Sequence, residues 1–140
     1  MKSVVIGVGS EFRGDDRIGL EVVKKLKKEV RNQNVMFIKT QVPENFFKKI
    51  KDFKPNKLII IDSADFGGKP GEFRIIDKNS IKENFSSTHN LPLTIFLKEV
   101  NCKKIVFIAV QYKNIKFGSR MSKDVKNSLE KITNFVKKII

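Results

Sequence analysis

The 140-residue sequence predicts a three-layer α/β/α sandwich, with helices on both faces of a mostly parallel, twisted sheet of about five strands. Two observations lead to this fold class. Short, wholly apolar runs rich in Val and Ile recur along the chain, as in strands that are buried on both faces of a sheet. Amphipathic segments separate these runs, as in the helices that join parallel strands. The length suits a single domain over residues 1–140.

The strands are expected where β-branched apolar residues run together. Four such runs predict buried strands: Val4–Val8, Val35–Thr40, Leu58–Ile61 and Ile105–Val110. Glu72–Ile76 alternates between apolar and polar residues, which favours an edge strand that can pair antiparallel. The third buried strand is expected to end at Asp62, which opens a polar loop.

The helices are expected where apolar residues recur every three or four positions. Three segments and the end of the chain show this spacing: residues 16–30, 43–53, 92–100 and the stretch that follows Ser122. Pro43 suits the first turn of the second helix. Ser122 is a good N-cap for the last helix, and Asp124 falls in its first turn, where the helix dipole favours a negative charge.

The sequence is strongly basic. Lys and Arg number 29 against 15 Asp and Glu, so the formal net charge is +14. Such an excess suggests an anionic partner, namely a nucleic acid, an acidic protein or a membrane surface. The lysines fall mostly on the outer faces of the predicted helices, and no interleaved aromatic pattern for base stacking accompanies them. We therefore interpret the charge as a solvated surface that aids solubility or docking to an acidic subunit.

Composition excludes several classes of site and location. The single cysteine, Cys102, excludes an internal disulfide or an all-cysteine zinc cluster, and the single histidine, His89, excludes a multi-histidine zinc site. We expect Cys102 to be an ordinary half-buried thiol at the amino-terminal edge of the sheet. No apolar run approaches the roughly 18 residues that span a bilayer. Residues 1–9 lead into charged residues without a cleavage site for a secretory signal, so we expect a cytoplasmic protein.

The loop after the first strand is the first candidate site, because ligands of such folds bind beyond the carboxyl ends of the strands. Residues 7–19 begin like a dinucleotide fingerprint. Phe12 stands where the third glycine is needed, however, and two aspartates stand where a phosphate would approach. Asp15 and Asp16 are both suited to capping the first helix. Two adjacent acids exceed what a cap needs, so we expect one carboxylate to be available to a ligand.

Three ionisable residues fall in segments that can reach the same edge of the predicted sheet: Asp16, Asp62 and His89. A carboxylate directly after a buried strand is costly to bury unless it meets a cation or hydrogen-bond donors. Two carboxylates and one imidazole suit a divalent transition metal with coordination positions left open. Each residue also has a structural interpretation, as a cap or turn residue for the aspartates and as a structural or solvated side chain for His89.

Five blocks of residues occur in order along nearly the whole chain. They are Gly7-Val8-Gly9-Ser10 with Asp15-Asp16 and Arg17-Ile18-Gly19; Pro43-Glu44-Asn45; Asp62-Ser63-Ala64-Asp65 through Pro70-Gly71-Glu72; Thr88-His89-Asn90-Leu91-Pro92; and Gln111 with Gly118 and Ser122. Together they resemble the maturation endopeptidases of nickel–iron hydrogenases. The sequence departs from that family's pattern at Ser10, Arg17 and Tyr112, where asparagine, glycine and proline are usual.

The resemblance implies an endopeptidase that removes the C-terminal extension of the nickel–iron hydrogenase large-subunit precursor after nickel insertion. The family's metal-contacting residues correspond to Asp16, Asp62 and His89. The metal is nickel supplied by the substrate, so the free protein needs no cofactor. Either the nickel or a carboxylate activates the water, and Asp16 and Asp62 are the candidate bases, as in an aspartic-type peptidase. Arg17 adds bulk and charge beside this site.

Two other function classes stay open on the sequence. One is a non-catalytic protein of the same fold that binds a metal or a maturation factor, for which Asp16, Asp62 and His89 are a docking site only. The other is a basic nucleic-acid-binding module, for which the net charge is the sole motive. The endopeptidase interpretation predicts the hydrogenase precursor as the partner. It also predicts that the enzyme binds no nucleic acid, does not insert into a membrane and is a monomer.

Overall fold

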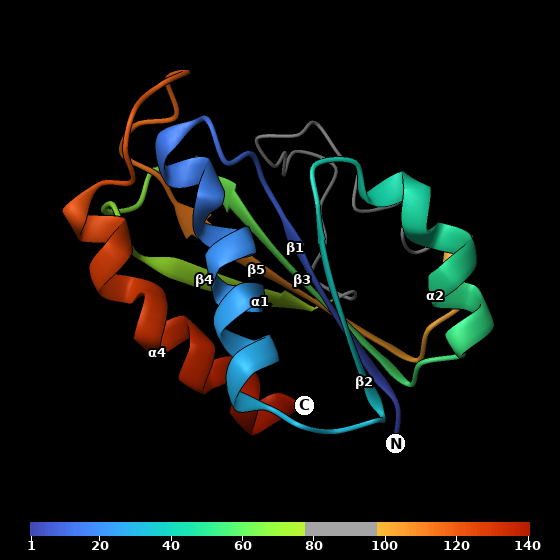
Figure 1. Cartoon of the computed structure of the whole chain (residues 1–140). Helices are drawn as coiled ribbons and strands as arrows, with labels where there is room; N and C mark the ends of the chain where they lie inside the picture. Colours follow the sequence, from blue (N-terminus) through green and yellow to red (C-terminus); the bar gives the residue numbers. More distant parts are fainter. Residues whose placement is uncertain (78–97) are drawn as a thin grey trace.

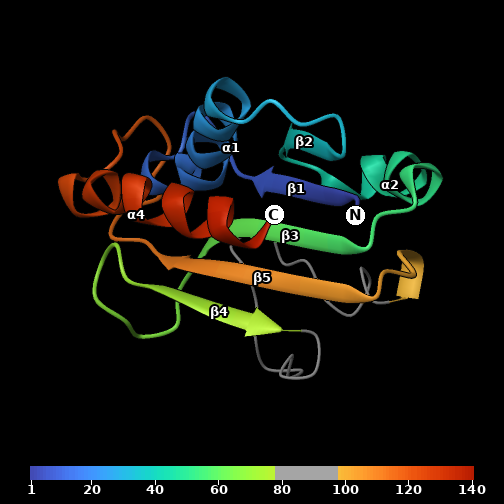
Figure 2. The same ribbon diagram turned by 90° about the horizontal axis from the view of Figure 1, so that it is seen from below.

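The computed structural model describes residues 1–77 and 98–140, which contain a five-stranded sheet in the order β2-β1-β3-β5-β4 (Figure 2). The strands are β1 Ser3–Val8, β2 Val35–Thr40, β3 Lys57–Ala64, β4 Phe73–Asp77 and β5 Lys104–Gln111. The pairs β1–β2, β1–β3 and β3–β5 are parallel, and β4 pairs antiparallel with β5 at the edge. The predicted sheet is therefore confirmed, including its antiparallel edge strand.

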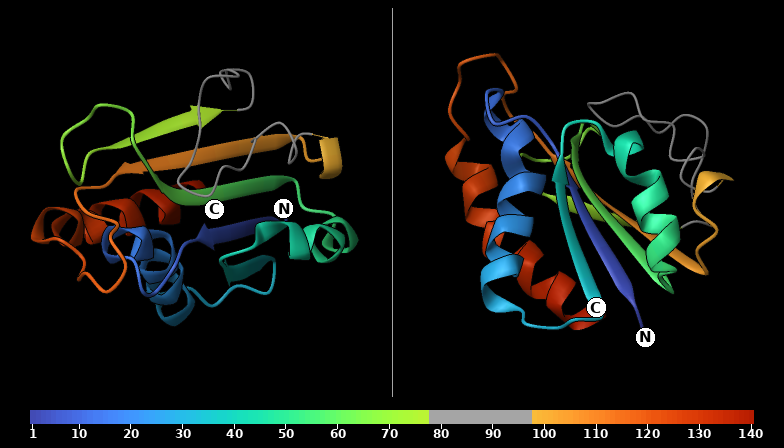
Figure 3. Two further views of the ribbon diagram at one scale, coloured as in Figure 1. Left: turned by 90° about the horizontal axis from the view of Figure 1, so that it is seen from above. Right: turned by 45° about the vertical axis from the view of Figure 1, so that its right-hand side comes forward.

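Helices cover both faces of this sheet (Figures 1 and 3). α1 (Ile18–Glu29) and α4 (Lys123–Ile139) lie side by side on one face, and α2 (Phe47–Phe53) lies on the other. A short 3₁₀ turn precedes each of the first two helices, η1 (Gly14–Arg17) before α1 and η2 (Pro43–Phe46) before α2. The three-layer α/β/α arrangement is confirmed.

The central strands are apolar on both faces because both faces are covered. Along β1, Val4 and Ile6 belong to the core cluster on the α2 side, whereas Val5 belongs to the cluster under α1 and α4. The same alternation continues in β3, where Ile60 faces α2 and Ile61 faces α1 and α4. Continuous apolar runs in the sequence thus become two cores separated by one sheet.

The topology creates a switch point between β1 and β3. From β1 the chain passes through α1 to β2 on one side, and then through α2 to β3 on the other side of β1. The two connections lie on opposite faces of the sheet. In open α/β sheets the crevice beyond the carboxyl ends of two such strands is the usual ligand site. The fold therefore directs attention to the segments that follow β1 and end β3.

Most predicted strand ends differ from the observed ones by one residue, and two boundaries near the candidate site differ in a way that matters. β3 runs to Ala64, so Asp62 lies inside the strand and does not open a loop. The strand continues because Asp62, Ser63 and Ala64 pair in register with the last three residues of β5. The first helix does not begin at Asp16, which lies in η1. The predicted helix over 92–100 falls almost wholly outside the described residues, which are helical there only at 98 and 99.

Two further expectations concern single residues. Ser122 is the N-cap of α4, and its Oγ accepts a hydrogen bond from the Val125 backbone N–H at 3.4 Å, as predicted. Cys102 lies before β5 at the amino-terminal edge, but it is buried rather than half-buried. Its Sγ lies within 3.5 Å of the Pro55 carbonyl oxygen. Among the helices of the described residues, none is long and apolar enough to cross a bilayer.

Candidate functional site

Glycines bring the segment after β1 into close contact with the sheet. A Cβ atom at Gly7 would overlap the carbonyl oxygen of Gly19, and one at Gly9 would overlap the carbonyl oxygen of Asp16. A Cβ at Gly19 would lie 2.5 Å from the carbonyl oxygen of Ile61 in β3. Side chains at these positions would force the backbones apart. Their absence lets η1 and the start of α1 lie directly on the β1–β3 pair.

Asp16 is buried at the carboxyl edge of the sheet. Its Oδ1 accepts a hydrogen bond from the Ser63 Oγ–H, with 2.5 Å between the two oxygens. Ser63 lies in the part of β3 that extends beyond its pairing with β1, since the β1–β3 register ends at Gly7 opposite Ile61. This short hydrogen bond fixes the orientation of the Asp16 carboxylate at the switch point.

Asp62 precedes Ser63 in β3 and is also buried. Successive side chains of a strand point to opposite faces. Asp62 shares a face with Ile60 and Ala64, both in the core cluster on the α2 side, whereas Ser63 and its partner Asp16 lie on the α1 side. The structure therefore brings the two predicted carboxylates to the end of the same strand, from its two faces.

The third predicted ligand, His89, lies outside the described residues. Within residues 1–77 and 98–140, no group of three or more His, Cys, Asp or Glu side chains is arranged to hold a metal ion. Asp16 and Asp62 are oxygen donors of the kind that divalent cations accept, but two carboxylates leave most of the coordination positions to other ligands. The described part of the site can therefore hold a metal only together with further ligands.

Asp15 has a role that the sequence did not indicate. It is fully buried, and its carboxylate accepts four hydrogen bonds from the segment between β5 and α4. Oδ2 accepts from the backbone N–H groups of Lys113 at 2.8 Å and Asn114 at 3.0 Å, and from the Ser122 hydroxyl at 2.9 Å. Oδ1 accepts from the Ser122 backbone N–H at 2.6 Å. The prediction that Asp15 caps the first helix is wrong, because its partners belong to another loop.

Gln111, the last residue of β5, organises the loop that follows β3. Its Oε1 accepts hydrogen bonds from the backbone N–H groups of Phe66 at 2.9 Å and Gly68 at 3.1 Å. Its Nε2 donates to the Asp65 Oδ1 at 3.3 Å and to the Tyr112 carbonyl at 3.0 Å. One amide side chain thus holds two loops at the carboxyl edge. The sequence predicts no positioning role for Ser63 or Gln111. The signals that could have indicated such roles are that Ser63 is adjacent to the predicted ligand Asp62 and that Gln111 belongs to one of the family blocks.

At the carboxyl edge of the sheet, several acidic side chains are buried while basic side chains of the neighbouring loops are exposed. The carboxylates of Asp15, Asp16 and Asp62 are buried, whereas Arg13 and Arg120 in the neighbouring loops are exposed. The surface is therefore basic where Arg13 and Arg120 lie, although the exposed acids Glu11 and Asp65 also belong to this edge. The expectation that the lysines lie on outer helix faces holds in α1, where Lys24, Lys27 and Lys28 are exposed.

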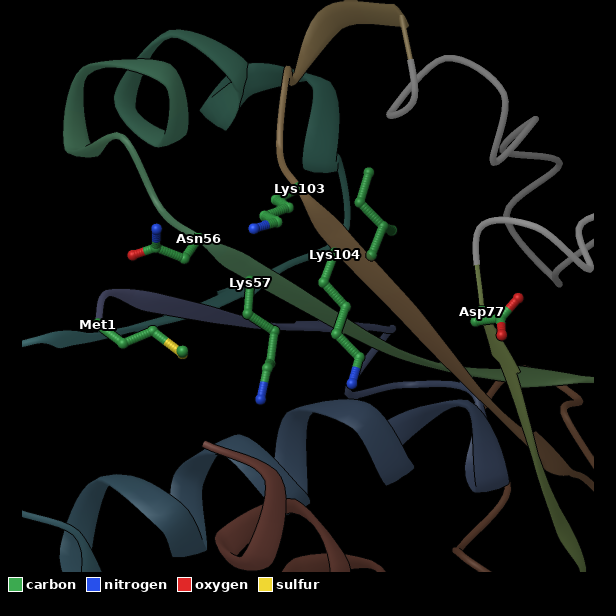
Figure 4. A pocket seen from close by; sticks show the side chains of 7 residues that line it. Met1, Asn56, Lys57, Asp77, Lys103 and Lys104 are labelled. Carbon is green, nitrogen blue, oxygen red and sulfur yellow. The ribbon is translucent and has the colours of Figure 1, made fainter.

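Two cavities lie at opposite edges of the sheet. One, of about 310 Å³, adjoins the candidate site and is lined by the loop after β1, the end of β2 and Leu20 of α1. The other, of about 480 Å³, lies where β3 and β5 begin, and Figure 4 shows Lys57, Lys103 and Lys104 around it. This second cavity lies at the far end of the strands from Asp16 and Asp62. The buried carboxylates lie at the carboxyl edge of the sheet, near the smaller of these two cavities.

Comparison with known proteins connects this arrangement to one family. The model for the hydrogenase maturation protease (HycI) family matches residues 20–139. A putative hydrogenase maturation protease of Methanocaldococcus jannaschii is 36% identical over 150 aligned residues, which cover 99% of this chain and 88% of that protein. The hydrogenase 3 maturation protease of Escherichia coli K12 is 30% identical over 135 aligned residues, which cover 94% and 86% of the two chains.

Structural similarity extends over the same length. The crystal structure of the NiFe hydrogenase maturation protease HycI from Thermococcus kodakarensis matches with a TM-score of 0.85 at 30% identity, covering 99% of this chain and 91% of that chain. The family match includes Asp62 and His89, and Asp16 lies just before it. The chain therefore belongs to the hydrogenase maturation protease family, and it is a peptidase.

Proposed function

We propose that this peptidase removes the C-terminal extension from the large-subunit precursor of a nickel–iron hydrogenase after nickel has been inserted. The observation that carries the proposal is the convergence of Asp16 and Asp62, both buried, on the end of β3 at the β1–β3 switch point. A peptidase of this family needs groups that bind the substrate and activate water at one place. Among the described residues the buried aspartates are Asp15, Asp16 and Asp62, and the carboxylate of Asp15 is taken up by the loop between β5 and α4.

Peptide hydrolysis requires a base or a metal to activate water near the scissile carbonyl. Asp16 and Asp62 are the candidate bases. The hydrogen bond from Ser63 holds the Asp16 carboxylate in one orientation, which reduces the cost of aligning it with a bound peptide.

We propose further that Asp16, Asp62 and His89 recognise the nickel that the precursor carries. Carboxylate oxygens and an imidazole nitrogen are ligands that nickel(II) accepts. Two carboxylates leave room in the coordination sphere for ligands from the precursor itself. The nickel is part of the substrate, and the free enzyme needs no metal of its own. We expect the enzyme to be a cytoplasmic monomer.

Variants of the three predicted residues test the site. The nickel-loaded precursor is incubated with the wild type, Asp16→Asn, Asp62→Asn or His89→Ala, and the intact mass of the large subunit is measured. We expect the wild type to release the extension and each variant to leave the precursor intact. Asp65→Asn is the matched control, because Asp65 is an exposed aspartate of the same edge, and it should process the precursor. Full cleavage by any of the three site variants removes that residue from the proposed machinery.

The alternative of a non-catalytic binding protein predicts a different result in the same assay. Such a protein would bind the precursor and leave its mass unchanged, with the wild type as with every variant. Circular dichroism spectra of the variants that match the wild type would show that a lost activity does not come from a lost fold.

A further inference from the structure

Two exposed phenylalanines stand beside the candidate site. The side chain of Phe12, in the loop after β1, is 65% exposed, and that of Phe117, in the loop after β5, is 75% exposed. Their ring centroids lie 6.3 Å apart with the planes tilted by 39°. Large aromatic side chains are rarely left this open to water in isolation, whereas paired aromatic side chains are common anchors at protein interfaces.

The backbone holds this pair in place. The Gly118 N–H donates to the Phe12 carbonyl at 2.7 Å, and the Gly14 N–H donates to the Ser119 carbonyl at 3.1 Å. Asp15 binds the other side of the same loop through its buried carboxylate. The two loops therefore form one connected surface, and the exposed rings do not result from loose chain ends. We call the surface of Phe12, Arg13 and Phe117 the aromatic rim.

Cations adjoin the aromatic rim on the side of Arg13, while the exposed Glu11 precedes Phe12 in the chain. The Arg13 guanidinium lies over the Phe117 ring, with its central carbon 6.0 Å from the ring centroid. Beyond Gly118 the surface continues into a cavity of about 470 Å³ lined by Arg17, Arg120 and Lys126, together with Ser119, Met121 and Glu21. Glu21 is paired with Arg17 at 2.9 Å, and its carboxylate is the single acidic group in that lining. Aromatic residues and arginines are the types most enriched in protein interfaces.

We infer that the aromatic rim and the adjoining basic cavity form the docking surface for the hydrogenase precursor, which presents an apolar side chain to Phe12 and Phe117 and acidic side chains to Arg13, Arg17 and Arg120. The inference rests on the proposed function for the identity of the partner. The charge pattern requires an acidic partner surface, because a basic one would be repelled by these cations. The rim is continuous with η1, the segment that carries the candidate base Asp16.

Binding to nickel-free precursor tests the inference without cleavage. The affinity of immobilised nickel-free precursor is measured for the wild type, for Phe12→Ser/Phe117→Ser and for Ile75→Ser. Ile75 is a matched control because it is a 46% exposed apolar residue on the edge strand β4, away from the rim. We expect the double variant to bind at least about tenfold more weakly and the control to bind like the wild type. With nickel-loaded precursor, the loss should appear in KM rather than in kcat.

Charge reversal tests the basic part of the surface. Two double variants change the net charge equally: Arg13→Glu/Arg120→Glu and the control Lys24→Glu/Lys138→Glu. Only the first pair lies in the proposed docking surface, with Arg13 in the aromatic rim and Arg120 in the adjoining cavity. We expect the rim variant to associate more slowly, and its association to depend less on salt, than the control. Unchanged melting temperatures would show that the variants are folded.

Three results would overturn the inference. If the double phenylalanine variant binds and cleaves like the wild type, the rim does not dock the precursor, while the proposed peptidase function stands. If the wild type forms dimers that the double variant does not form in sedimentation experiments, the rim is a contact between two copies of this chain. If the wild type neither binds nor cleaves the precursor, the proposed function fails and the docking surface fails with it.

Discussion

Replacing Asp15 should destabilise the protein far more than replacing any exposed acid. Oδ2 accepts three hydrogen bonds and Oδ1 accepts one, and the residue is fully buried. A hydrogen bond to a charged group contributes about 1.5–3 kcal/mol net. Four such bonds are not additive, and water replaces some of them, so we expect Asp15→Ala to lower the free energy of unfolding by about 3–5 kcal/mol. That loss is a large part of the roughly 5–15 kcal/mol typical of a whole protein.

Asp15→Asn should cost less, for a reason visible in the geometry. The asparagine carbonyl oxygen can take the place of Oδ2 and keep its three donors. The amide group then faces the Ser122 N–H, which now lies 2.6 Å from Oδ1, and two donors oppose each other. We expect a loss of about 2–3 kcal/mol from this variant. The free energy of unfolding should therefore be lowest for Asp15→Ala, higher for Asp15→Asn and highest for the wild type.

Urea unfolding followed by far-UV circular dichroism measures both losses, because the slope with urea should stay constant while the midpoint falls. Asp124→Asn is the control. Asp124 pairs with Lys113 at 3.2 Å, but the two side chains are 49% and 60% exposed, so its loss should cost at most about 1 kcal/mol. Amide hydrogen exchange should speed up at Lys113, Asn114 and Ser122 in the Asp15 variants. A loss below about 1 kcal/mol for Asp15→Asn, or unchanged exchange at these amides, would refute the reasoning.

Three further predictions concern the segments that position the site. Gly9→Ala should impair processing of the precursor and lower the melting temperature, because its Cβ would overlap the Asp16 carbonyl. In the control Gly67→Asn no atom lies within 4 Å of the added Cβ, and asparagine tolerates the positive φ of this position, so processing should be kept with a smaller loss of melting temperature. Ser63→Ala should lower kcat for the precursor more than it raises KM, because the Asp16 carboxylate loses the donor that orients it; equal kcat would contradict this role. Gln111→Leu should speed hydrogen exchange at the Phe66 and Gly68 amides, and unchanged protection there would show that the glutamine does not hold the loop.

The central architecture could be predicted from the sequence because burial and hydrophobicity coincide there. Val4–Val8 is buried throughout between the helices on both faces, and the observed β1 begins only one residue earlier, at Ser3. The end of β3 could not be predicted in this way. Asp62 and Ser63 extend the strand by pairing with β5, and hydrogen-bond pairing of polar residues leaves no hydrophobic pattern. At the edge that carries the candidate site, the hydrophobic pattern therefore ends before the strand does.

The candidate site likewise contains residues that the sequence predicts and contacts that it does not. Asp62 was predicted because it directly follows an apolar run, and Asp16 because two adjacent acids in the loop after the first strand exceed what a cap needs. The structure brings both to the end of β3. The partners of Asp15 lie 98 to 107 residues away along the chain, so no local pattern could distinguish its loop contacts from a helix cap. The basic surface at this edge depends on which side chains are buried, and net charge alone does not locate it. His89 falls outside the described residues and stays a prediction.

Nickel dependence of processing tests the central claim most directly. The purified protein is incubated with equal amounts of nickel-loaded and nickel-free precursor, and the intact mass of each large subunit is followed with time. The account predicts that the loaded precursor loses its C-terminal extension, while the nickel-free precursor keeps its full mass. An unchanged mass of the loaded precursor would contradict the proposed peptidase function, and equal cleavage of both would contradict recognition of the nickel.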